Sequence, residues 1–282
     1  MSMGRTARGA LELTRPLNAV SAGVLTFTGA YVAGGEVLAG DAPAVAAAVC
    51  ATVLATGAGN AVNDYFDREI DRVNRPDRPI PRGAISARGA LAFAIVLFGG
   101  AIGAALLLPP AAIGIAVFNL ALLLAYTELF KGLPGVGNVV VGFLTGSTFL
   151  FGGAAVGSPF GAGVLFVLAA VATITREIIK DVEDVAGDRE EGLNTLPIVI
   201  GERNATWIGI AILATAVAAS ALPFFRGDFG TAYLLVIVPA DLVMLAAAVR
   251  SLRDPASAQR RLKAGMLLAV VAFIAGRAAP FG

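Results

Sequence analysis

The sequence predicts an all-α integral membrane protein, with about nine transmembrane helices packed in one bundle around a central cavity. Hydrophobic residues occupy 57% of the 282 positions and charged residues only 15%, and the mean hydropathy is +0.80. The helices of a soluble domain carry a polar face, whereas long stretches of this chain are apolar on every face. These observations exclude an ordinary soluble fold and predict a single transmembrane domain over residues 1–282.

Nine apolar windows of about 18 to 22 residues are long enough to cross a hydrocarbon layer of roughly 30 Å. The predicted spans cover residues 16–33, 43–63, 87–108, 111–129, 136–156, 161–179, 205–225, 231–249 and 262–278. Between the third and fourth spans, Pro109 and Pro110 lack backbone N–H groups, so the chain is expected to turn there. Abundant Gly and Ala favour close packing of these helices in lipid.

The distribution of charge predicts the orientation of the bundle, because loops rich in Lys and Arg stay on the cytoplasmic side. Basic residues precede span one and follow the even-numbered spans. The opposite loops contain only the charged residues Glu36, Asp41, Arg226 and Asp228. We therefore expect a multi-pass protein of the cell membrane, with its N-terminus, its charged loops and its active site facing the cytoplasm.

An acidic motif lies at the predicted cytoplasmic end of span two. Asn63, Asp67 and Asp71 recur every four residues, so on a helix of about 3.6 residues per turn their side chains form one stripe. Carboxylates gathered at the edge of a bilayer are costly unless a cation neutralises them. Mg²⁺ is the expected cation, because it binds one or two carboxylates and completes its coordination with water and phosphate oxygens.

A second acidic motif follows span six, where Asp181, Asp184 and Asp188 share one helical face. Spans two and six run in the same direction, so the two motifs are expected to face each other. Together they would hold Mg²⁺ and clamp a diphosphate leaving group. The alternative is that the acids only balance nearby arginines, which does not explain their helical register. The predicted metal ligands are Asn63, Asp67, Asp71, Asp184 and Asp188.

Basic residues near the motifs complete the predicted site. Three prolines hold the segment after the first motif in an extended loop, from which Arg75 and Arg78 can reach phosphate oxygens. Lys180 precedes the second motif and offers the diphosphate a point charge. Arg82 and Arg88 are expected at anionic lipid headgroups instead.

Several other polar residues have open roles. Asn18 and Arg15 at the start of span one either reach the cavity or anchor the end of the helix. Lys131 follows span four, and whether it lines the active site is left open. Tyr126 and Asn138 flank the same loop as Lys131. A lone acid within span eight, at position 241, is a functional candidate because ionisable groups inside a membrane are costly.

The motifs resemble those of the UbiA superfamily of membrane prenyltransferases, whose pattern is Asn-x3-Asp-x3-Asp followed later by Asp-x3-Asp. The match extends to Lys180-Asp181 and to Asn74-Arg75-Pro76-x-Arg78-Pro79, and the resemblance covers nearly the whole chain. The catalytic residues that it implies are Asp67, Asp71, Asp184, Asp188 and Lys180. The substrate-binding residues that we assign are Asn18, Arg75, Arg78, Lys131, Arg176 and Asp181.

The residues of both motifs are similar to those of the archaeal branch of this family. That branch transfers a geranylgeranyl group to the free hydroxyl of geranylgeranylglyceryl phosphate. Arg176 stands where the family often has Tyr, and its charge suits an acceptor that carries a phosphate. The resemblance implies ionisation of a prenyl diphosphate assisted by Mg²⁺, followed by attack of the acceptor oxygen. The alternatives are an aromatic acceptor of the quinone or chlorophyll type and, from a different class, a divalent-cation transporter.

The expected partners are a prenyl diphosphate, a glycerophosphate-lipid acceptor and membrane lipids. No nucleic-acid role is expected, because the basic loops lack aromatic residues for base stacking, and no obligate protein partner is evident. The chain contains no His, which excludes zinc or haem ligation by that residue.

Overall fold

The protein is helical in the computed structural model, which describes residues 3–37, 39–130, 132–190 and 192–279. Within these ranges the chain forms α-helices and one π-helical turn, and no β-strand. The helices are α1 (Met3–Leu13), α2 (Pro16–Val32), α3 (Ala42–Phe66), α4 (Arg68–Asn74), α5 (Ala87–Ala105), α6 (Pro110–Ala125), η1 (Tyr126–Phe130), α7 (Val136–Ala155), α8 (Gly163–Glu190), α9 (Leu196–Ile200), α10 (Glu202–Ser220), α11 (Leu222–Phe225), α12 (Thr231–Arg250) and α13 (Pro255–Ala278).

Each predicted span falls on one of the long helices, namely α2, α3, α5, α6, α7, α8, α10, α12 and α13. In the described part of the chain, five segments are long and apolar enough to cross a membrane: α3, α5, α7, α12 and the stretch Glu202–Phe225. Of the other four, α2 has 17 residues and α6 has 16, and α8 and α13 carry charged residues at one end. The positions of the helices are confirmed, whereas the nine crossings and their orientation stay predictions.

The outer surface of the bundle is apolar. Large hydrophobic side chains are exposed on α5, α6 and α12, among them Val96, Leu124 and Leu235. A soluble monomer rarely exposes so many large apolar side chains, so this surface suits the hydrocarbon of a bilayer. The protein is accordingly a helical membrane protein.

Small residues bring the central helices into backbone contact. A Cβ added at Gly29 of α2 would collide with the carbonyl oxygen of Phe149 in α7, and one at Gly152 of α7 would collide with that of Thr26 in α2. This crossing is the close approach that small residues permit between membrane helices. Thr26 also shares a hydrogen bond of 2.8 Å with the hydroxyl of Thr52, which joins α2 to α3.

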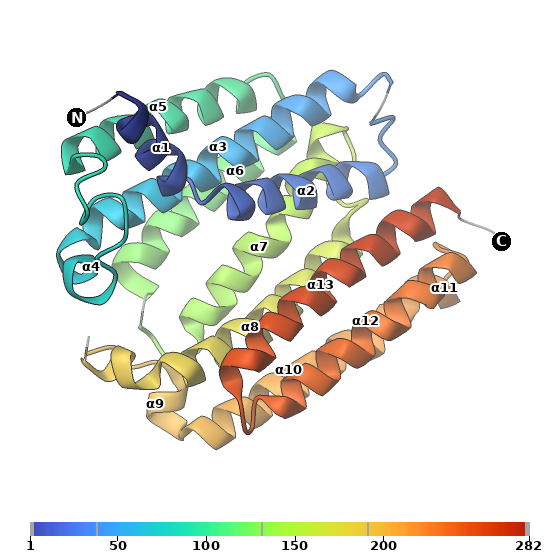
Figure 1. Cartoon of the computed structure of the whole chain (residues 1–282). Helices are drawn as coiled ribbons and strands as arrows, with labels where there is room; N and C mark the ends of the chain where they lie inside the picture. The colour runs from blue at the N-terminus through green and yellow to red at the C-terminus, as the bar shows by residue number, and fades with distance from the viewer. Residues whose placement is uncertain (1–2, 38, 131, 191, 280–282) are drawn as a thin grey trace.

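The two ends of the bundle differ. Figure 1 shows α4 and α9 at one end, whereas α11 and the last turn of α13 lie at the opposite end. Because α4 carries part of the first acidic motif and α8 leads into α9 after the second, both motifs lie at the same end. We call it the motif end.

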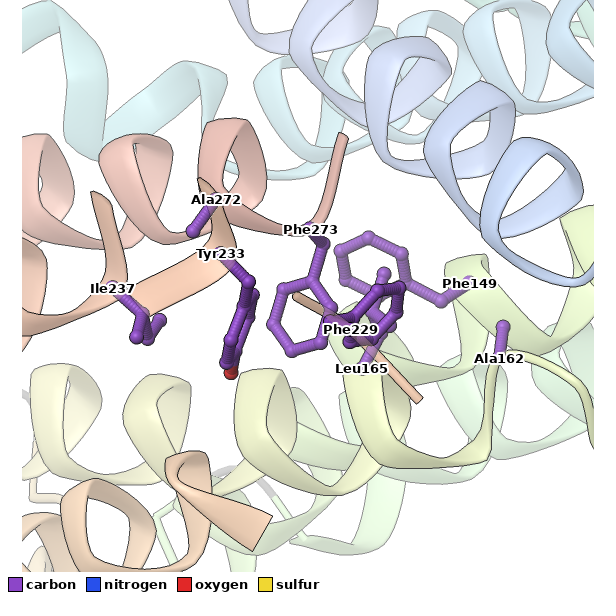
Figure 2. Close-up of a cluster of buried hydrophobic side chains, with 8 residues drawn as sticks. All are labelled: Phe149, Ala162, Leu165, Phe229, Tyr233, Ile237, Ala272 and Phe273. Atoms are coloured by element: carbon purple, nitrogen blue, oxygen red, sulfur yellow. The ribbon is translucent and has the colours of Figure 1, made fainter. Parts of the chain in front are cut away.

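The opposite end is closed by aromatic side chains. Figure 2 shows the rings of Phe149, Phe229, Tyr233 and Phe273 gathered with small and aliphatic residues, namely Ala162, Leu165, Ile237 and Ala272. The ring centroids of Tyr233 and Phe273 are 5.0 Å apart, and those of Phe229 and Phe273 are 5.6 Å apart in an edge-to-face arrangement. Such contacts add to the area that the rings bury, so the bundle is tightly packed at this end.

Candidate active site

The first acidic motif lies at a break between two helices. Helix α3 ends at Phe66 and α4 begins at Arg68, so Asp67 caps both. The N–H of Asp67 donates to the carbonyl of Asn63, at 2.9 Å, and the N–H of Asp71 donates to that of Asp67, at 2.8 Å. The helical spacing of the motif is therefore kept across the junction of the two helices.

The second motif lies on one uninterrupted helix. Helix α8 continues to Glu190, and its C-terminal part carries Lys180, Asp181, Asp184 and Asp188. An unbroken helix places side chains three, four and seven residues apart on one face. The predicted register of this motif is therefore the one that the structure has.

A polar cavity of about 560 Å³ lies between the two motifs. The charged residues that line it are Asp67, Asp71, Arg75, Arg78, Glu177, Lys180, Asp181, Glu183, Asp184 and Asp188. We call this space the polar cavity. The structure thus brings the two motifs together, although Asn63 is exposed and is not among the lining residues.

Two arginines and a buried acid hold the first motif in place. Arg78 Nη1 donates to Asp71 Oδ2 at 2.6 Å and to Asp64 Oδ1 at 3.2 Å. Arg15 Nη2 donates to the same Asp64 oxygen at 2.7 Å. Asp64 is only 4% exposed, and a buried carboxylate with two cationic partners fixes their positions as well as its own.

Asp64 contacts Arg78 of the polar cavity, and the sequence interpretation did not single it out. It lies seven residues before Asp71, so the two share a helical face, and this spacing was the available signal. Arg15, whose role was open, is an ion-pair partner of Asp64 across 49 residues of chain. Arg82 was expected at lipid headgroups, but it pairs with Glu12 of α1 and donates to the carbonyl of Asp77 at 2.6 Å.

The second motif carries its own paired charges. Lys180 Nζ lies 3.0 Å from Asp184 Oδ2, and Asn138 of α7 donates to Asp181 Oδ2 at 2.7 Å. Asp181 lies outside the predicted membrane span 161–179, two residues beyond its end. Burial raises its pKa to about 6, although the hydrogen bond from Asn138 and the charge of Lys180 act in the opposite direction. Burial lowers the pKa of Lys180, but its hydrogen bond to Asp184 and the surrounding acids raise the pKa above its ordinary value.

The donor set of the polar cavity fits a hard divalent cation. Among the described residues, no three Asp, Glu or Cys side chains converge as a ready-made metal centre. Four predicted ligands, Asp67, Asp71, Asp184 and Asp188, nevertheless line the same cavity. Mg²⁺ takes one or two carboxylates and keeps water or phosphate oxygens for the rest, so separated carboxylates on facing helices suit a cation that is shared with a substrate.

A second cavity, of about 470 Å³, continues into the bundle. Its walls come mainly from aliphatic and aromatic residues of α2, α7, α8, α10, α12 and α13, and its far end reaches Phe149 and Phe273 of the aromatic cluster. We call this space the apolar cavity. Tyr126 and Val141 line both cavities, so the two spaces meet at these residues.

The remaining predicted residues divide between the cavities. Arg75 and Arg78 line the polar cavity, as does Asn138, whereas Asn18 and Arg176 line the apolar cavity. Lys131 lies outside the described residues.

Asp241 also lines the apolar cavity. It had no identified partner in the sequence, and it accepts a hydrogen bond of 2.6 Å from Ser220.

One buried hydroxyl in each cavity has no hydrogen-bond partner within the described chain. Thr195 lines the polar cavity and Thr173 lines the apolar cavity, and the Oγ1 atoms of both are buried without a partner among the described residues. Buried polar atoms are nearly always hydrogen-bonded, so each of these hydroxyls has an unused capacity to bond to water or to a ligand. Both cavities therefore contain polar atoms suited to a ligand.

Comparison with known proteins assigns nearly the whole chain to one family. A model of the UbiA prenyltransferase family matches residues 22–274. Digeranylgeranylglyceryl phosphate synthase of Natronomonas pharaonis is 59% identical over 273 residues, which cover 96% of this chain and 98% of the relative. The enzyme of the same name from Halobacterium salinarum is 57% identical over 272 residues, with the same coverage.

Solved structures agree with this comparison. A structure of a digeranylgeranylglyceryl phosphate synthase superimposes with a TM-score of 0.80 at 31% identity, and the match covers 96% of this chain and 98% of the other. A UbiA homolog from Archaeoglobus fulgidus bound to GPP and Mg²⁺ has a TM-score of 0.67 at 17% identity, over 96% and 100% of the two chains. At that identity the likeness shows the fold.

Proposed function

This chain belongs to the UbiA prenyltransferase family, and from that premise we propose that it transfers a geranylgeranyl group from geranylgeranyl diphosphate to geranylgeranylglyceryl phosphate. The acceptor is its free hydroxyl, and the product contains the second ether bond of an archaeal membrane lipid. Relatives named digeranylgeranylglyceryl phosphate synthase, at 59% and 57% identity, support this activity. The observation that carries the proposal is the junction, at Tyr126 and Val141, of a carboxylate-lined cavity with an apolar one.

The polar cavity is the proposed site of the diphosphate. Asp67 and Asp71 on one side and Asp184 and Asp188 on the other would hold a divalent cation, for which we propose Mg²⁺. When bound, such a cation neutralises charge on the departing diphosphate. Arg75 and Lys180 supply further positive charge to its oxygens.

The apolar cavity is the proposed site of the prenyl chain. Its walls exclude water from the carbon that reacts, which limits hydrolysis of the cationic transition state. The bond between the first prenyl carbon and the diphosphate oxygen breaks, and its electron pair leaves with the diphosphate. The acceptor oxygen then forms the new bond to that carbon and gives up its proton, for which the carboxylates of the polar cavity are the available bases.

The proposed location is the cell membrane, with the motif end facing the cytoplasm. The segregation of Arg and Lys to the loops at one side supports this orientation. The acceptor and the product, both lipids, would exchange directly with the bilayer.

Product analysis of the purified protein in lipid nanodiscs tests the proposal. The reactions contain Mg²⁺, labelled geranylgeranyl diphosphate, and either geranylgeranylglyceryl phosphate or 4-hydroxybenzoate, each with and without EDTA. We expect an ether lipid that is lost with EDTA. Prenylation of 4-hydroxybenzoate alone would keep the family chemistry but contradict the acceptor, and no product with either acceptor would contradict the proposed function.

A further inference from the structure

The apolar cavity contains two cations that the metal site does not explain. Arg176 of α8 and Lys263 of α13 both line it, although most of its walls are hydrocarbon. Arg176 is partly buried, whereas Lys263 is exposed and lies at the start of the predicted span 262–278. A cationic group inside a membrane protein is costly and usually marks a functional site, and this argument applies to Arg176. The presence of the two cations here indicates that the cavity receives an anionic group as well as a prenyl chain.

The two cations lie at the same seam of the bundle. Ala172 and Ile179 of α8 pack against Leu262 of α13 in one buried cluster. Arg176 lies between Ala172 and Ile179 on this face of α8, and Lys263 directly follows Leu262. Both residues line the apolar cavity, and the cluster shows that the helices that carry them pack against each other.

The existing partners leave part of this charge uncompensated. Arg176 is paired with Glu177, which itself lines the polar cavity. Lys263 forms no ion pair with any residue that the structure describes. The acid of this cavity, Asp241, accepts a hydrogen bond from Ser220 of α10. An anion held by both cations would balance the positive charge.

A neutral donor points to the same place. Thr173 is 1% exposed and lines the apolar cavity, and its buried hydroxyl has no partner among the described residues. It lies three residues before Arg176, so the two side chains share one face of α8. An oxygen-rich ligand beside Arg176 would satisfy this hydroxyl.

The position of Arg176 along α8 matches the chemistry of the acceptor. Lys180, which lines the polar cavity, is one turn beyond Arg176, about 6 Å along the helix axis. In geranylgeranylglyceryl phosphate the free hydroxyl is on the carbon next to the one that bears the phosphate ester. A phosphate held at Arg176 would therefore present its hydroxyl near the junction of the two cavities, where the prenyl carbon loses its diphosphate.

We propose that Arg176 and Lys263, with the hydroxyl of Thr173, bind the phosphate of the acceptor lipid, an inference that rests on the proposed function. This site is separate from the carboxylate site of the prenyl diphosphate. It selects a phosphorylated acceptor and orients its hydroxyl.

Steady-state kinetics with and without the acceptor phosphate tests this site. The acceptors are geranylgeranylglyceryl phosphate and geranylgeranylglycerol, at saturating geranylgeranyl diphosphate, for the wild type and the R176Q/K263Q double variant. Removing the phosphate should lower kcat/KM of the wild type about 10- to 100-fold. The double variant should lose a similar factor with the phosphorylated acceptor, and little more when the phosphate is removed.

Controls separate this role from a structural one. Arg261→Gln removes a neighbouring exposed cation of α13 that lines neither cavity, and it should leave both acceptors unaffected. The charge-preserving variant Arg176→Lys should recover part of the preference for phosphate, and the KM for geranylgeranyl diphosphate should stay within about twofold of the wild type. Thermal unfolding checks that each variant is folded.

The outcomes distinguish the site from the function. If the double variant loses the same factor with both acceptors, or if its KM for geranylgeranyl diphosphate rises instead, the phosphate site is wrong while the activity stands. If the wild type makes no product from the phosphorylated acceptor, the proposed function fails and the site fails with it.

Discussion

The polar and apolar cavities are built on the same helix but perform opposite tasks. The C-terminal part of α8 contributes Lys180, Asp181 and Asp184 to the polar cavity, whereas its earlier turns contribute Leu168 and Ala172 to the apolar one. The polar cavity gathers charge, and the apolar cavity excludes water. A substrate with a charged head and a hydrocarbon tail requires both, and the bond that breaks joins the head to the tail. The difference therefore places the chemistry at the junction.

The two cavities also differ in how their polar groups are held. In the polar cavity, Arg78 and Lys180 each pair with an acid of the motifs, so opposite charges already fix one another. In the apolar cavity, polar groups are sparse and one hydroxyl, that of Thr173, has no partner within the described chain. Substitutions of charged residues in the polar cavity should thus impair the chemical step, and those of the cations and Thr173 in the apolar cavity should impair acceptor recognition.

Removal of divalent cations should have the largest effect, because it disables the polar cavity as a whole. EDTA should abolish turnover, and excess Mg²⁺ should restore it. The measurement is ether-lipid formation by purified protein before and after the restoration. Unchanged turnover in EDTA would show that the carboxylates do not act through a metal. Thermal unfolding should change little, because the aromatic cluster and the helix crossings contain no metal ligands.

Single carboxylates of the polar cavity should come next. Asp67→Asn or Asp184→Asn keeps the shape of the side chain but removes a charge from the metal ligands, and should lower kcat about 1,000-fold. Asp228→Asn at the opposite end is the matched control and should retain activity. Near-normal turnover in both motif variants, with Mg²⁺ present, would contradict the assignment of these residues.

Much of this comparison was predictable from the sequence, because local periodicity determines it. The positions of the long helices follow from runs of apolar residues, and the register of Asp181, Asp184 and Asp188 follows from an unbroken helix. The approach of the two motifs follows from the equal direction of spans two and six. These features depend on short stretches of chain and on the predicted direction in which each span runs.

Other features depend on contacts between distant segments, which periodicity does not contain. Asn63 is exposed and lies outside the lining of the polar cavity, whereas Asp67 and Asp71 line it. The pair of Arg15 with Asp64 joins residues from α2's start and from α3. Lys263 and Arg176 likewise line one cavity only because α13 packs against α8, so a basic residue that indicated only topology in the sequence becomes part of the proposed phosphate site.

Asp64 should show an intermediate effect, because it acts on the polar cavity through Arg78. Asp64→Asn removes the charge that holds both Arg15 and Arg78, so Arg78 should be less well positioned between Asp71 and the diphosphate. We expect kcat to fall about 10- to 100-fold. Asp77→Asn, in the exposed loop that follows, is the control.

A purely structural role for Asp64 gives a different result. It would lower the temperature of unfolding without changing the Mg²⁺ requirement of the folded fraction. A positioning role should raise the Mg²⁺ concentration needed for half-maximal rate in protein that remains folded. An Asp64→Asn variant with unchanged Mg²⁺ dependence would remove Asp64 from the site.

The two unpartnered threonines should have the smallest effects and the sharpest contrast. Thr195→Val and Thr173→Val each replace a hydroxyl by a methyl group of similar size, so each should cost about 2- to 10-fold in kcat/KM. The loss should appear in the KM for geranylgeranyl diphosphate with Thr195→Val, and in the KM for the phosphorylated acceptor with Thr173→Val. The same KM changing in both variants would show that Thr173 and Thr195 do not bind different charged groups, the acceptor phosphate and the diphosphate.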